Sequence, residues 1–292
     1  MKGIYKIILS LLFVVVISGI ITYGVLKFRI INSHKILNGK IHKILELHEG
    51  IDVKKNKIDY PIYYINLDRS TDRKRKMEKQ FNKYGVENTT RISAVDGKKL
   101  SIMKEGFVTG LGSYSNYFIM TPRELGCTLS HIKAIKQAYD SGLETVLVLE
   151  DDVSLDLMPL WSVEKLSDLV KTFPDWEIVK FGNVLCPNKA MVNIEYYVWG
   201  KNCWSSSSYL INRRGMKSII DSFFQNDHII LDTKLSKGKG TADQILFANA
   251  KTLVYHPLMF FGLPIKSTIN SLYEASMLYD TSKNIDKYLD NL

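Results

Sequence analysis

The sequence predicts an α/β protein in which strands and helices alternate behind a membrane anchor. Three observations predict this class: an uncharged apolar run near the N-terminus, strand-like runs that neighbour helix-like patterns, and an apolar strand that ends in three acids. The 292 residues are enough for one large domain with appendages. An apolar fraction of 46% and a charged fraction of 24% are those of a folded globular protein.

The anchor is the run from Ile7 to Leu26, which holds no charged residue and is long enough to span a bilayer as a helix. The run is longer than the apolar core of a signal peptide, and no convincing cleavage site follows it. We therefore expect a single-pass membrane protein with its large domain beyond the anchor, a type II arrangement. Lys2 and Lys6 precede the run and Lys27 and Arg29 follow it, so charge alone leaves the orientation open.

Four regions follow from this organisation. Residues 1–31 form the tail and transmembrane anchor, and residues 32–59 form a polar, lysine-rich stem with a weakly amphipathic pattern. Residues 60–270 form the globular domain, and residues 271–292 form a C-terminal tail.

The net charge of +9 suggests an anionic ligand, a nucleic acid or a membrane surface as partner. The lysines are dispersed, however, and no stripe of basic residues interleaved with aromatics stands out. We expect most of them to form a solvated surface, and we expect no nucleic-acid partner.

The globular domain begins with a β-type run, Pro61 to Leu67, followed by a helix that Ser70 or Thr71 can cap and that ends near Gly85. A second helix starts at Thr121, where an N-cap, a proline in the first turn and Glu124 form a capping-box pattern. It carries an apolar face and ends at Ser141-Gly142.

The next strand, Thr145 to Leu149, lacks polar alternation, which indicates a strand buried on both faces of a largely parallel sheet. Glu150, Asp151 and Asp152 follow it directly. Ligands of open α/β sheets bind beyond the carboxyl ends of the strands, and carboxylates there are suited to Mg²⁺ or Mn²⁺ beside phosphate. The alternative is a solvated loop in which all three acids point outward.

Six motifs occur in an order that resembles glycosyltransferase family 25, which includes lipo-oligosaccharide and collagen galactosyltransferases. They are "YYINLDRSTDR", "ISAVDG", "ELGCTLSH", "VLVLEDDV", "SSSSYLINRRG" and "TADQ". The resemblance implies a GT-A-like fold, a Rossmann-like nucleotide-binding sheet merged with an acceptor-binding half. It also implies a UDP-sugar donor, a divalent cation (Mn²⁺ or Mg²⁺), inversion at the anomeric carbon, and a glycan, glycolipid or glycoprotein acceptor.

By the resemblance, the acid triplet is the family's variant of a DxD motif. Asp152 is the first choice for direct metal contact, and Glu150 the second, with the nucleotide ribose as an alternative partner for Glu150. Asp151 can serve either the metal or the nucleotide. His256, late in the chain, is a candidate additional metal ligand.

The donor side is expected at Asn66, Arg69 and Arg73, just after the first strand, where arginines can pair with phosphate. Surface solubility is the alternative role for Arg73. Asp96 is a candidate for a hydrogen bond to uracil or ribose, or simply forms a turn with Gly97. The family motif places Ser130 and His131 near the donor, although a histidine on an apolar helix face is also common as a core residue.

Inverting transfer needs a general base for the acceptor hydroxyl. Asp243 in "TADQ" is the leading candidate; it can instead orient the acceptor, or Thr241 and Asp243 can simply start the helix. Trp204, before four serines, is either a platform for an acceptor sugar or part of the core.

The three cysteines, Cys127, Cys186 and Cys203, lack the spacing of a zinc site. In an oxidising compartment Cys186 and Cys203 can pair, whereas Cys127 is expected to pack as a small apolar residue.

Two other functions use the same residues: a metal-dependent phosphoryl hydrolase, and a non-catalytic protein that binds glycans or nucleotide sugars on a degenerate transferase scaffold. The first needs further acids or histidines for a second metal ion.

Overall fold

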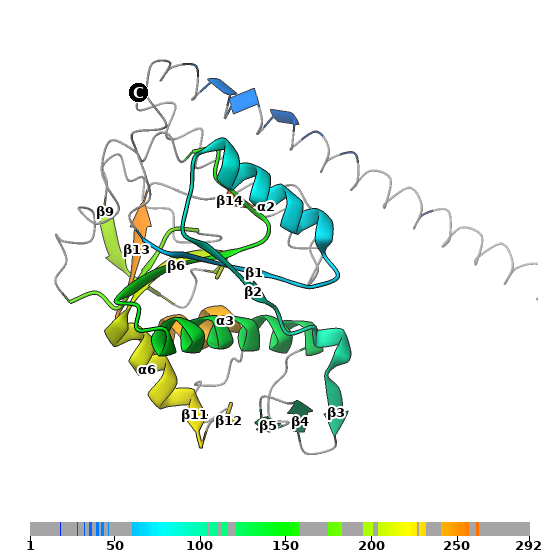
Figure 1. The fold of residues 1–292 in the computed structure, drawn as a ribbon, viewed down its shortest axis with the longest axis vertical. Helices are drawn as coiled ribbons and strands as arrows, with labels where there is room; N and C mark the ends of the chain where they lie inside the picture. Colours follow the sequence, from blue (N-terminus) through cyan, green and yellow to red (C-terminus); the bar gives the residue numbers. More distant parts are fainter. Residues whose placement is uncertain are drawn as a thin grey trace, which may run out of the picture.

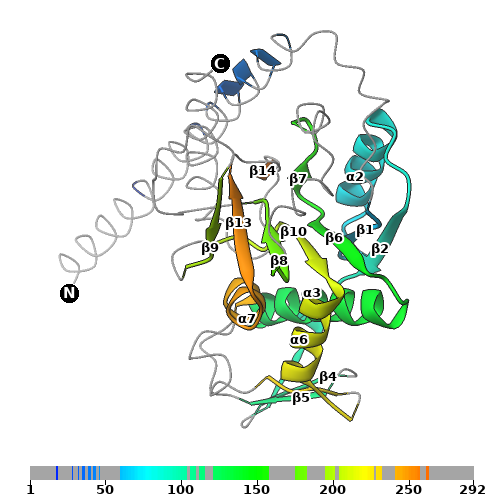
Figure 2. The same ribbon diagram turned by 90° about the vertical axis from the view of Figure 1, so that its left-hand side faces the viewer.

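The structure is a computed structural model that describes residues 60–103, 106–109, 112–115, 121–157, 175–182, 195–200, 204–226, 228–231, 241–256 and 261–262, with isolated positions between 18 and 46. These residues form three layers, a central sheet with helices on both faces (Figure 1). Helix α2 covers one face, and α3, α6 and α7 lie on the other (Figures 1 and 2).

The helices are α2 (Thr71–Lys83), α3 (Pro122–Asp140), α6 (Arg213–Phe223), α7 (Ala242–Ala248) and the 3₁₀ turn η2 (Gly97–Lys99). The central sheet consists of β1 (Ile62–Asn66), β2 (Thr89–Ser93), β6 (Thr145–Glu150), β8 (Ile178–Lys180), β9 (Glu195–Val198), β10 (Ser208–Asn212) and β13 (Thr252–His256). Smaller sheets are formed by β3 (Ser101–Met103), β4 (Gly106–Thr109) and β5 (Gly112–Ser115), by β7 (Val153–Ser154) and β14 (Phe261–Gly262), and by β11 (Phe224–Gln225) and β12 (His228–Ile229).

The strand directions determine where the functional residues meet. Within the described residues the central sheet has the order β2-β1-β6-β10-β8-β13-β9. Strands β2, β1 and β6 run parallel, and β10 is antiparallel to both β6 and β8. The carboxyl ends of β1, β2, β6, β8 and β13 and the amino end of β10 therefore lie along one edge of the sheet.

Each face of the sheet is sealed by its own apolar cluster. Met77 and Phe81 of α2 pack with Ile62, Leu147 and Leu149 on one face. On the other face, residues of α3, α6 and α7 pack against Val146, Val148, Tyr209 and further strand residues. Strand β6 is buried on both sides, so it is a rigid base for the acids that follow it.

The predicted elements are confirmed with two differences. Helix α3 begins with the predicted capping box, in which Thr121 and Glu124 exchange hydrogen bonds, and Pro122 lies in its first turn. Ser70 stands at the N-cap of α2, but its side chain makes no capping hydrogen bond. The sheet is mixed rather than largely parallel, because β10 lies antiparallel beside β6. A strand's apolar run reports burial on both faces and carries no information about the direction of its neighbour.

The predicted anchor at Ile7 to Leu26 lies outside the described residues apart from Ser18, and Cys186 and Cys203 lie outside them too. Among the residues that are described, none belongs to a helix long and apolar enough to cross a membrane.

Candidate active site

The three acids after β6 differ sharply in their surroundings. Asp151 is buried, accepts a hydrogen bond of 2.6 Å from the Asn66 amide, and forms an ion pair with Arg73. Asp152 lies farther from Arg73, at 3.4 Å, and its side chain is 24% exposed. Arg73 is therefore no surface residue, since it is itself buried between two carboxylates. When all three acids are ionised they carry a charge of −3. Arg73 pairs closely with Asp151 and only at a longer distance with Asp152, so the negative charge of Asp152 is less fully offset.

Glu150 is held from two elements. The Ser206 hydroxyl donates to its Oε1 over 2.9 Å, and Nε2 of His131 lies 3.3 Å from the same oxygen. The other ring nitrogen of His131 lies 3.1 Å from the Tyr209 hydroxyl. Because a carboxylate can only accept, Nε2 carries the proton in neutral His131, and Nδ1 then accepts from Tyr209. His131 is fully buried, as expected of a core histidine, and its ring orients the Glu150 carboxylate.

The acids have different affinities for protons. Burial, followed by the charge of Glu150, raises the pKa of Asp152 to about 7. Burial also raises the pKa of Asp151, with Arg73 and Asn66 opposing the shift. For Glu150 burial acts in the same direction, but the hydrogen bonds from His131 and Ser206, together with the charge of Arg73, outweigh it and hold the pKa below its usual range. A cation beside Asp152 would offset the cost of ionising this buried carboxyl group next to Glu150.

A second group of site residues comes from the loop after β2. Arg69 donates to Asp96 over 2.8 Å through Nε, and Asp96 also accepts from the backbone N–H of Lys98, capping η2. Asp96 therefore acts as a turn residue, which was its alternative role, and also forms an ion pair with Arg69. The hydrogen bonds from Arg69 hold the pKa of Asp96 below its usual range, although burial opposes this.

Two glycines allow this loop to lie directly on α3. A Cβ on Gly97 would stand 2.1 Å from the carbonyl oxygen of Pro122, and one on Gly126 would stand 2.7 Å from the carbonyl oxygen of Val95. Ser130 fastens the contact, since its hydroxyl accepts from the Val95 N–H over 2.8 Å. Ser130 is therefore a residue that fixes the loop beside the pocket.

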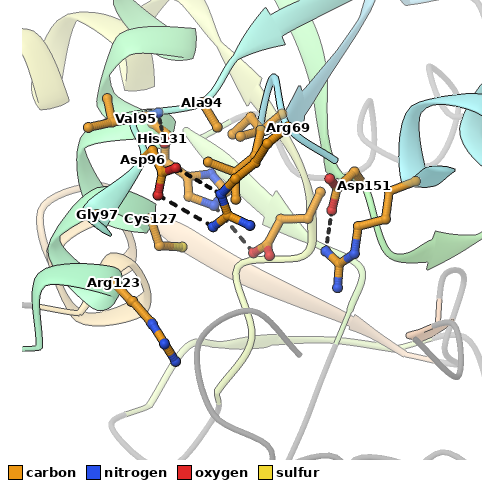
Figure 3. A pocket seen from close by; sticks show the side chains of 14 residues that line it. Arg69, Ala94, Val95, Asp96, Gly97, Arg123, Cys127, His131 and Asp151 are labelled. Carbon is orange, nitrogen blue, oxygen red and sulfur yellow. Dashed lines mark hydrogen bonds and ion pairs between the residues drawn. The ribbon is translucent and has the colours of Figure 1, made fainter. Parts of the chain in front are cut away.

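These groups lie around one open pocket (Figure 3). It is lined by Ile65, Leu67, Arg69, Arg73, Ala94, Val95, Asp96, Gly97, Arg123, Cys127, Ser130, His131, Glu150 and Asp151. Figure 3 shows Arg69 and Asp96 facing each other across their contact, and Arg123 extending away from them. Asn66 is buried at the same edge, where it donates to Asp151 and accepts from Arg91 over 2.8 Å.

A further group of buried charges lies on the other side of β6. Asp243, in the first turn of α7, accepts a hydrogen bond from the backbone N–H of Ser205. Its Oδ1 is buried and has no hydrogen-bond partner in the described part of the chain. Burial raises the pKa of Asp243, with the charge of Lys180 opposing the rise.

Lys180, at the end of β8, is a charged residue of this edge that sequence reasoning missed. It is fully buried, and burial lowers its pKa to about 7, with Asp243 opposing the shift. Nothing in "IVKFG" separates it from a surface lysine at a strand end. The only sequence signal was its position after a short apolar run.

The remaining expectations have mixed outcomes. Cys127 packs against the core and also faces the pocket; its thiol, His131 and Glu150 offer atoms within 4.8 Å of one another, a group that could hold a metal ion. Trp204 is half-buried beside the serine loop. His256 ends β13 at the same sheet edge, but its side chain is not among those described, so its role as a ligand stays a prediction.

Residues 59–233, more than half of the chain, match the protein family described as "Glycosyltransferase family 25 (LPS biosynthesis protein)". The chain belongs to glycosyltransferase family 25. This confirms the resemblance inferred from the six motifs, five of which lie within the matched residues.

Known members of family 25 are similar to part of this chain. A "Glycosyltransferase 25 family member" of Aedes aegypti is 30% identical over 204 residues, covering 67% of this chain and 33% of the relative. "Procollagen galactosyltransferase 2" of Mus musculus is 31% identical over 169 residues, covering 54% of this chain and 27% of the relative. The chain thus spans about a third of the length of these curated relatives, or less. The crystal structure of "a glycosyltransferase involved in the glycosylation of the major capsid of PBCV-1" aligns with a TM-score of 0.32 and 13% identity, over 76% of this chain and 98% of that one.

The residues present fit a divalent cation of the kind expected for this family. Asp151 is committed to Asn66 and Arg73, which leaves Asp152 and Glu150 as the carboxylates able to contribute oxygen ligands. The raised pKa of Asp152 indicates a carboxylate whose charge is incompletely offset by the protein alone. Hard oxygen donors of this kind suit Mn²⁺ or Mg²⁺.

Proposed function

We propose that this protein transfers a hexose, galactose or glucose, from a UDP-sugar to a hydroxyl group of a glycan, glycolipid or glycoprotein, with inversion at the anomeric carbon. The observation that supports this most is the convergence of Glu150, Asp151 and the Arg69–Asp96 pair on one pocket at the carboxyl ends of parallel strands. This is the edge at which open α/β sheets bind nucleotides. The family and the arrangement together favour a GT-A-like domain.

The donor would occupy the pocket between β1, the loop after β2, and α3. Asp96 and Arg69 are placed to bind the ribose or the base, and Arg69 is 43% exposed and so within reach of a ligand. Arg73 instead neutralises Asp151 and does not contact phosphate in this arrangement. Its role is to hold the acid strand end in place.

Asp152 and Glu150 would hold the divalent cation, with His256 as a further candidate. When bound, the cation supplies positive charge against the diphosphate as the nucleotide leaves. Glu150 is kept ionised and oriented for this by His131 and Ser206.

Asp243 is the proposed general base for the acceptor hydroxyl. A base needs an unengaged oxygen and a pKa above that of an ordinary surface carboxylate. Asp243 has both, because its Oδ1 is unpartnered among the described residues and burial raises its pKa.

The proposed acceptor and cellular setting rest on the family and on the sequence. The family description mentions LPS biosynthesis, and the mouse relative is named for procollagen, so both glycolipid and protein acceptors are included. The predicted anchor at Ile7 to Leu26 would place the reaction at a membrane surface, as a type II single-pass protein.

The test uses the purified full chain with UDP-galactose or UDP-glucose, in Mn²⁺, in Mg²⁺ and in EDTA, with and without glycan, glycolipid and glycopeptide acceptors. We expect UDP release that needs the cation and increases with an acceptor. Asp152→Asn should lower kcat at least about 100-fold, in line with removal of a group that stabilises developing charge. Asp72→Asn, on the exposed side of α2, is the matched control. Release that is independent of any acceptor would favour a hydrolase, and undiminished turnover by Asp152→Asn would exclude the proposed role of this residue.

A further inference from the structure

Lys180 has no part in the mechanism above, yet it is one of the largest fully buried side chains. Burying an ammonium group is unfavourable unless it gains strong partners. Its Nζ donates to the backbone carbonyl oxygen of Trp204 and lies 5.2 Å from the centre of the Phe247 ring. A buried cation thus holds one particular peptide group.

The other side of that peptide group is held as well. Its N–H belongs to Ser205 and donates to the carboxylate of Asp243. The C=O and N–H of a trans peptide point in opposite directions. Lys180 and Asp243 therefore bind the Trp204–Ser205 peptide group from opposite sides. The buried ammonium group contacts the carbonyl oxygen, and the buried carboxylate contacts the N–H.

The Trp204–Ser205 segment has an unfavourable backbone conformation. Ser205 has a φ of 90°, in a region that residues with a side chain rarely adopt. Such a conformation persists only where the surroundings enforce it. Its own hydroxyl contributes, since it donates to Ser207 Oγ over 2.8 Å and accepts from the Ser207 N–H.

The same short loop reaches the acid triplet. The residue after Ser205 is Ser206, whose hydroxyl donates to Glu150. Over two consecutive residues the chain thus contacts the proposed base and one proposed ligand of the cation. The placement of both depends on the loop that Lys180 holds.

We propose that Lys180 is a positioning residue for the transfer reaction: by holding the Trp204 carbonyl it keeps the Trp204–Ser207 loop in its strained form, and the loop in turn orients Asp243 and Glu150. The role goes beyond charge balance, because the lysine acts through a peptide group and touches neither substrate nor cation. This inference rests on the proposed transferase function for its kinetic consequence only.

The kinetic test compares Lys180→Met, which keeps the length of the side chain and removes the donor, with the wild-type full chain. We expect kcat for UDP-galactose to fall about 10–100-fold, as for reacting groups misplaced by a fraction of an ångström. The KM for the donor should change less than about threefold, because the Arg69–Asp96 pair lies on the other side of β6. Lys83→Met, which loses a 3.0 Å contact with Asp156 away from the pocket, is the matched control.

Rescue separates positioning from a loss of folded protein. Glycine adopts positive φ without strain, so Ser205→Gly in the Lys180→Met background should recover about fivefold of the lost kcat. A merely structural lysine would not respond to a change in backbone freedom at Ser205. Equal kcat for Lys180→Met and Lys83→Met, or no recovery in the double variant, would overturn the proposal.

Amide hydrogen exchange tests the loop without any donor or turnover. In the full chain, the Ser205 amide should exchange about tenfold faster in Lys180→Met than in wild type, while the amides of β6 keep their protection. Unchanged exchange at Ser205 would contradict the proposal whatever the enzyme assay shows. If the wild type releases no UDP from any donor, the proposed function fails, and this measurement still decides whether Lys180 holds the loop.

Discussion

The two sides of the site differ in how their buried charged groups are paired. On the arginine side, formed by Asn66, Arg69, Arg73, Asp96 and Asp151, each charged group has a partner within a few ångströms. On the lysine side, formed by Lys180, Asp243 and the Trp204–Ser207 loop, the two charges are separated by a peptide group.

Polar atoms without partners mark the same difference. Oδ1 of Asp243, Oγ1 of Thr241 and Oγ of Ser208 are buried without a hydrogen-bond partner among the described residues. Buried polar atoms are normally paired, so such atoms require an explanation. The charged groups of the arginine side are paired with one another, whereas the lysine side retains unpaired groups of the kind that reactive sites keep.

The largest expected effect comes from breaking the arginine side. Arg73→Met would leave Asp151 buried without its ion-pair partner, and removal of one partner of a buried pair typically costs about 3–5 kcal/mol. We expect a fall in the thermal unfolding midpoint of about 6–15 °C. Arg75→Met, on the exposed side of the same helix, should change it by less than about 2 °C. A similar small shift for both variants would show that the arginine side is less tightly coupled than its contacts indicate.

The next effect concerns the contact of the loop after β2 with α3. In Gly97→Ala the new methyl group would meet the Pro122 backbone, so the loop has to move. Overpacking of this kind costs about 1–3 kcal/mol, and displacement of Asp96 should weaken UDP binding about tenfold in calorimetry. Gly200→Ala is the control, because no atom lies within 4 Å of its added Cβ. Unaltered UDP affinity in Gly97→Ala would argue against the donor lying at Asp96.

The third prediction concerns Asp152, at the boundary between the two sides. Its folded-state pKa of about 7 lies above the ordinary carboxyl value of 3.8. The contribution of Asp152 to the free energy of unfolding is therefore fully present below about pH 4, and it is lost as the pH rises through 7. Without a divalent cation, Asp152→Asn should be more stable than wild type at pH 8 by about 1–2 kcal/mol. The difference should vanish near pH 4 in thermal unfolding series.

An aspartate with the opposite shift supplies the control for this pH series. The hydrogen bonds of Asp156 with Tyr84 and Lys83 outweigh the effect of its burial and lower its pKa. Asp156→Asn should therefore be less stable than wild type at pH 8, with the gap narrowing as the pH falls through the carboxylate range. A pH-independent difference for Asp152→Asn would contradict a raised pKa.

The smallest expected effect on stability is that of Arg69→Ala. Arg69 is 43% exposed, and exposed ion pairs contribute less than about 1 kcal/mol. If Asp96 and Arg69 bind the donor, the same variant should nevertheless raise the KM for UDP-galactose about tenfold with a smaller change in kcat. A loss of stability above that range, with donor KM unchanged, would assign the pair to the scaffold alone.

Much of the arginine side could be predicted from sequence because its parts follow strand ends. "INLDR", "AVDG" and "LEDD" each follow a strand of one parallel set, and parallel strands end at one edge. The different surroundings of Asp151 and Asp152 could not be predicted. Asp151 is paired with Arg73 of helix α2 and Asn66 of strand β1, and these contacts are not visible in the sequence around the two acids.

The lysine side was less predictable for a similar reason. Asp243 could be proposed from its motif, but Lys180 had no recognisable pattern, and its partner is a backbone carbonyl that can be identified only once β8 and β10 lie side by side. The antiparallel placement of β10 was also missed, although it is what brings the serine loop to the carboxyl end of β6.

The sequence by itself determined the family, the alternation of strands and helices, and the edge of the sheet at which acids gather. These depend on local patterns, namely apolar runs, caps and motif order, which are written in consecutive residues. Only the tertiary structure decided which carboxylate is neutralised, which keeps an unpaired oxygen and which lysine is buried. Those properties depend on distances of a few ångströms between segments far apart in the chain, and burial and charge at such distances set both pKa and hydrogen bonding.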